Sequence, residues 1–231
     1  MSNAEDRWIA PNQGLRMWRQ LEDGVRGMML DVHDEDGVTS LCHGLCSLGS
    51  RPLTEALIEL RTFMDCHPAE VLTIIFEPHV EEARIAASFE EAGLLPYLHE
   101  QPLGAPWPTL RAMIESGHRM VIFTETSEVS LPWYHYAYAY AWDNDYANEM
   151  PSDLDCVPNR GTGSEPVFVL NHFLTAPIAM RSLAEMINHD PFFLDRVRRC
   201  QTETGQLPNF ITVDFYDIGD LFSVVDTMNG F

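Results

Sequence analysis

Lysine is absent from this sequence, so all 14 of its basic residues are arginine. The 35 acidic residues outnumber them and give a formal net charge of −21. A negative field of this size repels nucleic acid and anionic membrane surfaces, and we expect no nucleic-acid partner. The same field is compatible with a calcium site, because hard cations prefer carboxylate oxygens. Acidity alone proves no such site, since it also serves only to keep a protein soluble.

Cysteines are few, and none of them forms a C-x-x-C pair. They are Cys42, Cys46, Cys66, Cys156 and Cys200. Zinc-finger spacing is missing, which excludes a structural zinc site of that kind. Scattered cysteines in a chain of this length indicate either buried thiols or a few disulfides in an exported protein. The odd count predicts one free thiol or a missing partner.

Long hydrophobic runs are also lacking. No run approaches the length of a transmembrane helix, and the first residues, MSNAEDRW, contain no apolar signal core. With Met1 as the true start, the chain is therefore expected in the cytoplasm. The 231 residues are 45% hydrophobic, enough for a real core, and we predict one domain over residues 1–231.

The region from 24 to 44, GVRGMMLDVHDEDGVTSLCHG, organises the rest of the chain. We predict a strand over 26–32, an acidic turn at 34–37 that ends in Asp-Gly, and a second strand over 38–42. The second strand ends on His43, beside a glycine that lets a ligand approach the backbone. Such a pair of strand ends can bind a metal and move a proton. The alternative is a solvated acidic turn and an ordinary core histidine.

The rest of the chain mostly alternates between strand and helix patterns, which predicts an α/β fold with a parallel sheet. We expect strands over 71–76, 120–123, 167–170 and 210–213. We expect helices over 12–23, 52–66, 81–92, 109–116, 178–187, 192–204 and 221–228. Between 126 and 165 the periodicity is lost, and an aromatic run at 133–142 indicates a packed loop, with contact to lipid or inositol as the alternative.

Polar residues end all six predicted strands. They are Asp31, His43, Glu77, Glu125, Asn171 and Asp214. Parallel strands present their carboxyl ends at one edge of the sheet, so these side chains are expected to converge there. Strands often end on polar residues by chance, but six of six favours a site.

Several segments together resemble the phosphatidylinositol-specific phospholipase C (PI-PLC) X-domain family. They are QLEDGVRGMMLDVHD (20–34), LCHGLC (41–46), HPAEVLTIIFE (67–77), NRG (159–161), VFVLNHF (167–173) and PNFITVDFY (208–216). They follow the family's order and span most of the chain. The fold implied by the resemblance is an irregular TIM (β/α) barrel of the PLC-like phosphodiesterase type.

The resemblance implies cleavage of a phosphodiester by the neighbouring inositol 2-hydroxyl, giving a cyclic phosphate and diacylglycerol. His43 matches the histidine that protonates the leaving alkoxide, and such an acid is worth about 10² to 10⁴ in rate. Asp31 and Glu77 match carboxylates that hold Ca²⁺ in calcium-dependent members. Asp214 is assigned to orienting a histidine or binding substrate hydroxyls. Arg160 is our candidate for phosphate binding, with a surface arginine as the alternative.

Two positions differ both from the family members that hold Ca²⁺ with carboxylates and from the calcium-independent members that carry an arginine. Met29 stands where some members carry a second carboxylate, so the set of metal ligands is thinner. His33 stands where calcium-independent members carry an arginine. Neither group of members is matched in full, and His33, His79 and His172 are interpreted as structural histidines.

The first-strand H-N motif of the family, which holds its general base, is absent. Met1 stands where a bulky residue follows that motif in relatives, so we expect a true start upstream that supplies the first strand. An export signal there would suit the cysteines and place the protein outside the cell or in the cell envelope. As given, the chain is expected to be nearly inactive. An upstream stop codon with no in-frame H-N motif would contradict this expectation.

Two other functions are open at this point. A glycerophosphodiester phosphodiesterase uses a similar barrel, but it wants Glu-x-Asp at 29–31 and His-Asp at 43–44, where this chain has Met29 and Gly44. A catalytically inactive member that binds phosphoinositides is a non-enzyme alternative, and the missing base supports it. For the enzyme we expect a phospholipid or inositol-phosphodiester substrate, transient contact with a membrane surface, and a monomer.

Overall fold

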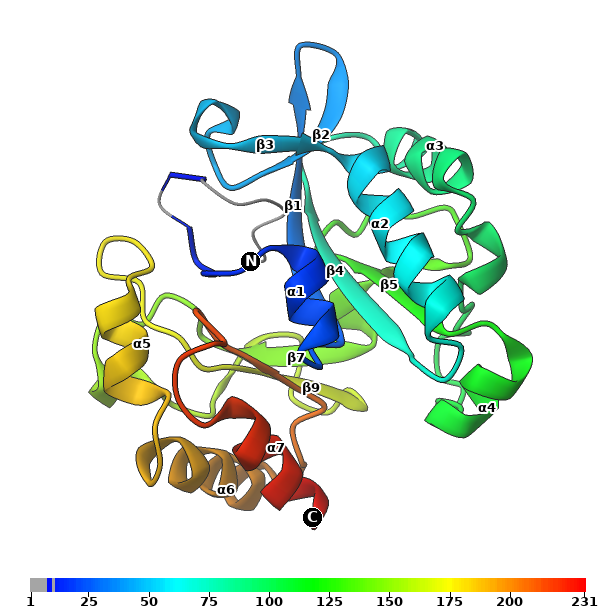
Figure 1. The fold of residues 1–231 in the computed structure, drawn as a ribbon. Helices are drawn as coiled ribbons and strands as arrows, with labels where there is room; N and C mark the ends of the chain where they lie inside the picture. The colour runs from blue at the N-terminus through cyan, green and yellow to red at the C-terminus, as the bar shows by residue number, and fades with distance from the viewer. Residues whose placement is uncertain (1–7, 10) are drawn as a thin grey trace. The chain divides into compact units, whose positions relative to one another are not determined.

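The computed structural model describes residues 8–9 and 11–231, and it contains two compact units (Figure 1). The first unit is built on Leu15–Ala137 with residues 8–9. The second is built on Tyr138–Phe231 with residues 11–14. Each unit is described by itself. A single domain over 1–231, and closure of the strands into one barrel, therefore stay predictions.

The first unit contains a six-stranded sheet in the order β3-β2-β1-β4-β5-β6. Its strands are β1 (Gly27–Glu35), β2 (Val38–Cys42), β3 (Ser50–Pro52), β4 (Leu72–Pro78), β5 (Met120–Thr124) and β6 (Tyr134–Tyr136). Strands β1, β4, β5 and β6 run parallel, whereas β1, β2 and β3 form an antiparallel meander. The hairpin predicted around Asp-Gly is confirmed, because β1 pairs with β2 across it.

Apolar runs and helical spacing explain how this unit forms its core. Five consecutive residues of β4, from Leu72 to Phe76, are buried, as expected for a strand covered on both faces. The helices are α1 (Met17–Glu22), α2 (Leu53–Cys66), α3 (Glu82–Ala92) and α4 (Leu110–Ser116), with short turns η1 (Cys46–Leu48) and η2 (Leu95–Tyr97). Helices α2 and α3 lie side by side in Figure 1 and bury apolar residues spaced three and four apart.

The second unit contains a four-stranded sheet in the order β10-β9-β7-β8. Its strands are β7 (Ala141–Asn144), β8 (Pro158–Arg160), β9 (Val167–Asn171) and β10 (Phe210–Thr212). Its helices are α5 (Arg181–Ile187), α6 (Phe192–Thr204) and α7 (Leu221–Asn229), with turns η3 (Ala137–Ala139) and η4 (Pro151–Asp153). Strands β7 and β8 lie inside the region that was expected to be a loop. They were not predicted because three or four residues are too few to show a strand period.

Two predicted helices begin later than expected. The helix predicted over 12–23 covers only Met17–Glu22, because the Gln13 amide donates to the Val213 carbonyl at 2.8 Å and accepts from the Tyr216 amide at 2.9 Å. A partner 200 residues away cannot be seen in a local pattern. The helix predicted over 178–187 begins at Arg181 as α5, whereas α2 begins at Leu53 with Pro52 as its N-cap, one residue after the predicted start.

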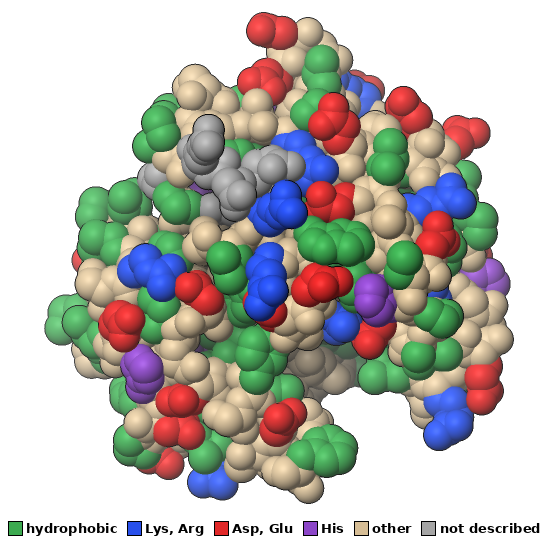
Figure 2. Space-filling view, viewed as in Figure 1, with side chains coloured by type: hydrophobic (Ala, Val, Ile, Leu, Met, Phe, Trp, Pro, Cys, Tyr) green, Lys and Arg blue, Asp and Glu red, His purple; other side chains and the backbone are tan. Residues whose placement is uncertain are grey.

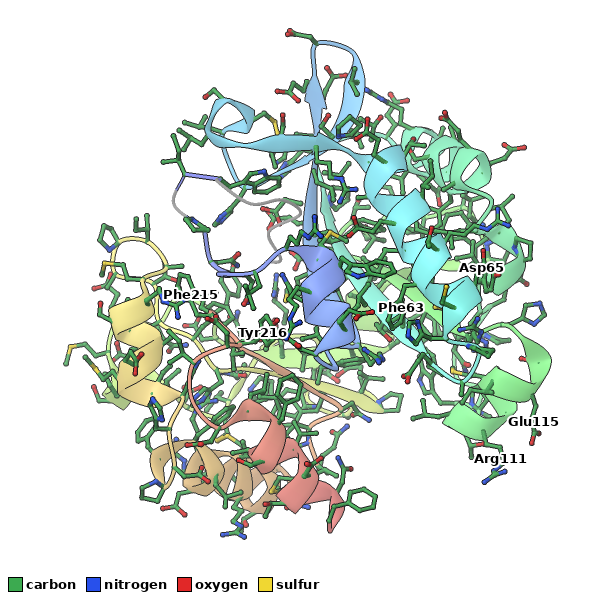
Figure 3. All side chains as sticks on the ribbon, in the orientation of Figure 1. Phe63, Asp65, Arg111, Glu115, Phe215 and Tyr216 are labelled. Atoms are coloured by element: carbon green, nitrogen blue, oxygen red, sulfur yellow. A yellow bond between two sulfur atoms is a disulfide. The ribbon has the colours of Figure 1, made fainter. Side chains whose placement is uncertain are left out.

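Arginine takes structural roles in the first unit that lysine would fill poorly. The Arg26 guanidinium lies 4.9 Å from the centre of the Phe63 ring, and its Nε donates to Glu70 at 2.7 Å (Figure 3). A planar guanidinium can stack and form ion pairs at the same time. Figure 2 shows acidic side chains scattered among arginines over the visible face rather than gathered into one patch.

The cysteines form two disulfides in the described residues. Cys42 is bonded to Cys46, Cys156 is bonded to Cys200, and Cys66 is an exposed free thiol. One free thiol was expected from the odd count. Among the described residues, every helix is too short or too polar to cross a bilayer.

Removing the disulfide between Cys156 and Cys200 should lower the stability of the second unit. Its partners are 44 residues apart, and in the chain-entropy model such a loop contributes about 4 kcal/mol, against about 2 kcal/mol for the four-residue separation of Cys42 and Cys46. We expect urea unfolding of C156S/C200S to show the larger loss. Cys66→Ser is the matched control and should leave the free energy of unfolding unchanged. A smaller loss than in C42S/C46S would contradict the prediction.

Candidate active site

Three carboxylates lie at one level of adjacent parallel strands in the first unit, near the end of their parallel pairing, although Asp31 does not end β1 as predicted. Asp31 of β1 is the register partner of Glu77 of β4. Glu125 directly follows β5, and its amide donates to the Phe76 carbonyl at 2.9 Å, which places it at the same level. Parallel pairing with this register therefore brings side chains from three distant segments to one edge of the sheet.

His43 reaches the same edge by a different route from the one expected. Its strand β2 is antiparallel to β1, so the rule for parallel strand ends does not apply to it. Strand β1 instead continues past Asp31 to Glu35, and β2 returns beside it with Leu41 opposite Val32. His43 comes two residues later, back toward the level of Asp31. The hairpin, rather than the parallel sheet, delivers this histidine.

The Asp31 carboxyl group is in an unfavourable place for a charge. Asp31 is only 8% exposed, and its Oδ1 has no hydrogen-bond partner in the described part of the chain. Burial, together with the negative charges of Glu77 and Glu125, raises the pKa of Asp31 to about 7. A buried carboxyl group with an unpartnered oxygen favours either a proton or a bound cation.

The His43 imidazole responds to the same neighbours. Burial lowers the pKa of His43, the charge of Glu77 opposes this change, and His33 adds to it. Glu77 therefore influences both Asp31 and His43. Of the five predicted site residues, the structure thus brings Asp31 and His43 each within electrostatic reach of Glu77.

Two more histidines belong to this edge, although the sequence gave them only a structural role. The rings of His33 and His79 stack at 4.2 Å between their centres, and His79 Nε2 lies 3.3 Å from a Glu77 oxygen. His33 Nε2 is buried and has no hydrogen-bond partner among the described residues. Burial and His79 lower the pKa of His33. Each histidine follows its strand-end carboxylate by two residues, and this spacing is the sequence signal that could have found the pair.

A complete metal centre is not formed by protein groups alone. Within residues 8–9 and 11–231, no group of three or more His, Cys, Asp or Glu side chains is arranged to hold a metal ion. The unpartnered oxygen of Asp31 and the neighbouring Glu77 are hard donors of the kind that Ca²⁺ prefers. These two residues fit as part of a coordination shell, which substrate and water oxygens would complete.

Arg160, in the second unit, is already paired with a carboxylate. Its Nε lies 3.1 Å from Asp143, whose side chain is 3% exposed. Its guanidinium also lies 4.7 Å from the ring centre of Tyr138 and 4.4 Å from that of Tyr146. Asp143 and the two tyrosines hold Arg160 in a fixed orientation, and the Asp143 carboxylate neutralises its charge.

A polar chain extends this ion pair across the second sheet. Asn171 Nδ2 donates to Asp143 at 3.1 Å, and the Thr212 hydroxyl donates to Asn171 at 2.9 Å. The chain follows the carboxyl ends of β7, β9 and β10. Asn171 was expected as a strand end, but Asp143 was missed because β7 has only four residues.

Asp214 lies two residues beyond β10 and is 7% exposed. Burial raises the pKa of Asp214 to about 6, against the effect of a hydrogen bond from Asn12. Phe215, which follows it, has a positive φ of 48°, and its amide donates to the Asn12 carbonyl at 2.8 Å (Figure 3). Asp214 and Arg160 belong to the second unit and the three other predicted site residues to the first.

Comparison with known proteins gives a consistent result. A family model described as PI-PLC X 1 matches residues 6–229. A PI-PLC X domain-containing protein of Arabidopsis thaliana is 30% identical over 95% of this chain and 55% of its own length. An uncharacterized secreted protein of Arthroderma benhamiae is 23% identical over 92% of this chain and 54% of its own length. The chain thus spans about half the length of these two relatives.

Solved structures of low sequence identity share the fold. Two crystal structures of phosphatidylinositol-specific phospholipase C from Staphylococcus aureus match all of this chain and 88% of their own. Their TM-scores are 0.64 and 0.66, at 12% and 14% identity. The α/β, TIM-barrel-like character of the predicted fold is confirmed by this likeness.

The buried Asp31 predicts a pH dependence of stability. Its pKa is about 7 in the folded chain against 3.8 ordinarily, so between these values the folded state binds the proton more tightly than the unfolded state does. Stability should therefore fall as the pH rises from 4 to 7. Asp31→Asn should be more stable than the parent at pH 8, by up to about 4 kcal/mol, and the gain should vanish near pH 4.

Urea unfolding at pH 4, 6 and 8 measures this difference. Glu115→Gln, on the outer side of α4, is the control and should behave as the parent does at every pH (Figure 3). A loss of stability in Asp31→Asn at pH 8 would show that the carboxylate makes favourable contacts instead.

Proposed function

The chain belongs to the PI-PLC X domain family, and from that premise we propose that it cleaves a phosphodiester of an inositol phospholipid, with His43 as the general acid. The observation that carries the proposal is the convergence of His43, Asp31 and Glu77 at one edge of the first sheet. An acid next to carboxylates that can bind a cation suits a reaction in which negative charge develops on phosphate.

In the proposed reaction the inositol 2-hydroxyl attacks phosphorus and the bond to the diacylglycerol oxygen breaks. The departing alkoxide takes a proton from His43, and a cyclic phosphate is formed. The lowered pKa of His43 makes its protonated form a stronger acid, while Glu77 helps to keep that form populated. We assign no residue of this sequence to the base that takes the proton of the 2-hydroxyl.

Asp31 and Glu77 are the proposed protein ligands of a calcium ion, which when bound would neutralise charge on the phosphate. Asp31 has to lose its proton to bind the ion, so its raised pKa should weaken calcium binding below about pH 7. Metal affinity and acid catalysis would then respond to pH in opposite directions, because His43 needs its proton and Asp31 must lose one.

The two residues of the second unit have supporting roles in the proposal. A guanidinium paired with Asp143 attracts phosphate less than a free one does, so Arg160 is better suited to orient substrate oxygens by hydrogen bonds. Asp214, with its raised pKa, is assigned to substrate hydroxyls or to orienting a histidine. Transient contact with a membrane surface, a monomeric state and export from the cell complete the proposal, and a secreted relative supports the last of these.

A catalytically inactive phosphoinositide-binding protein is the second candidate, because we assign no residue of this sequence to the general base. One assay separates the two functions. Residues 1–231 and a form extended by its upstream coding sequence are incubated with phosphatidylinositol vesicles. Cyclic inositol phosphate from either form supports the enzyme. Vesicle binding without product from both supports the binding protein.

Substitution of His43 should remove the general acid. We expect His43→Ala to lower kcat on phosphatidylinositol by about 10² to 10⁴ without a matching change in KM. The loss should be much smaller with the p-nitrophenyl ester of inositol 1-phosphate, because its leaving group needs no proton. His118→Ala, an exposed histidine, is the control and should retain full activity. Equal losses on both substrates would show that His43 is not the acid.

Calcium binding can be tested without activity. Calcium should raise the Tm of the parent at pH 8, and the rise should shrink in Asp31→Asn and in Glu77→Gln, because each substitution removes a ligand. The rise should also shrink for the parent at pH 5.5, where Asp31 is protonated. Glu115→Gln is the matched control. An unchanged response in both ligand variants would exclude this calcium site.

A further inference from the structure

His43 lies inside a small covalent ring. The disulfide joins Cys42, the last residue of β2, to Cys46, the first residue of η1, with their Cα atoms 5.0 Å apart. Only His43, Gly44 and Leu45 lie between the two cysteines. The backbone of the proposed general acid is therefore tethered on both sides within four residues.

Among the described residues, the His43 ring has no hydrogen bond of the kind that commonly orients a functional histidine. A functional histidine is commonly held by a hydrogen bond to the ring nitrogen that does not react. Other buried histidines of this chain follow that rule, with His135 Nδ1 at 2.9 Å from the Ile122 carbonyl and His172 Nε2 at 3.1 Å from the Ile187 carbonyl. Within residues 8–9 and 11–231 the His43 ring makes no such bond. The conformation of its backbone therefore matters more for its orientation.

Among the described residues, few backbone hydrogen bonds hold the connection that contains His43, and the one from outside it runs from the Ile9 amide to the Leu48 carbonyl at 2.8 Å. Cys42 and Ser50 are register partners in β2 and β3, so residues 43–49 form the connection between the two strands. Its internal backbone bonds run from Leu48 to Leu45 and from Gly49 to Cys46, at 2.9 and 3.0 Å. Both bonds lie after His43 in the chain. The disulfide links Cys42, the residue before His43, to this part of the connection.

Gly44 supplies the backbone conformation that the ring needs. Its φ is +73°, in the left-handed region, and a Cβ at this position would meet nothing within 4 Å. Glycine is therefore required here for conformation and not for space. The ring and the left-handed glycine together set the direction in which the His43 side chain leaves the chain.

We propose that the Cys42–Cys46 disulfide is a redox-sensitive device that positions His43 for proton donation. The inference rests on the proposed function of His43. A dithiol would attack Sγ of the half-exposed Cys46, beside the exposed Leu45, and displace Cys42 as a thiolate that takes up a proton. The second thiol of the reagent then forms the reagent's own disulfide and releases Cys46 as a thiol. Two electrons and two protons pass from the dithiol to the protein.

Kinetics on two substrates give the first test, in the form of the protein that cleaves phosphatidylinositol. Reduction by a dithiol, or C42S/C46S, should lower kcat on phosphatidylinositol about 10- to 100-fold, because a misplacement of about 1 Å costs a reaction about that much. KM should stay within about twofold, and cleavage of the p-nitrophenyl ester should persist, since that substrate needs no acid. Full turnover of phosphatidylinositol after reduction, or an equal loss on both substrates, would overturn the proposal.

Two controls separate positioning from general damage. C156S/C200S removes the other disulfide, in the second unit, and should leave the ratio of the two activities unchanged. Gly44→Ala keeps both disulfides but strains the ring, and it should reproduce the selective loss on phosphatidylinositol. Gly104→Ala is its match, because Gly104 has a φ of +79° and equal space but is far along the chain from His43. If the ratio of activity on phosphatidylinositol to activity on the p-nitrophenyl ester were equal in the two glycine variants, the proposal would be contradicted.

A spectroscopic readout keeps the two proposals distinguishable. In protein with isotope-labelled histidine, the His43 ring signal should broaden or shift on reduction, whereas that of the exposed His118 should not. An unchanged His43 signal would overturn the positioning role, whatever the activity. Absence of cleavage in every oxidised form would instead sink the proposed function.

Discussion

The parallel register of β1 with β4 is the constraint on which the candidate site depends. It places Asp31 beside Glu77, and continuation of the sheet to β5 adds Glu125 at the same level. Three carboxylates in one place repel one another, and burial of Asp31 adds to the penalty. Parallel pairing of β4 with β1 on one side and with β5 on the other holds this register in spite of the repulsion.

The antiparallel hairpin that precedes this parallel sheet has a separate function. Strand β1 extends beyond the level of the carboxylates, and β2 returns to it with His43 at its end. A histidine on a connection is easier to misplace than one within a strand, and here a covalent ring takes the place of an orienting hydrogen bond. The proposed acid and the proposed cation-binding groups thus come from elements that are held in different ways.

Patterns of a few residues were enough to predict much of the first unit. The run from 71 to 76 predicts β4 to within two residues at either end, and the Asp-Gly turn joins β1 to β2 as expected. The strand-end rule predicted that Asp31 and Glu77 lie close together, which their register confirms, although β1 continues past Asp31. It also placed His43 at this edge, but the antiparallel pairing of β2 shows that the reason was wrong. The second unit was harder to predict, because β7 and β8 are too short for a period and Asp143 lies inside an aromatic run.

The sequence by itself determined the local elements, the acidic character and the residues that close each strand, because these depend on neighbours along the chain. Only the tertiary structure decided which cysteines pair, which carboxylate neutralises Arg160, and why residues 12 and 13 do not form a helix. The raised pKa of Asp31 was likewise decided only by the tertiary structure. Each of these results comes from contacts or electrostatic effects through space, most of them between segments far apart in sequence, and such separations leave no periodic pattern to detect.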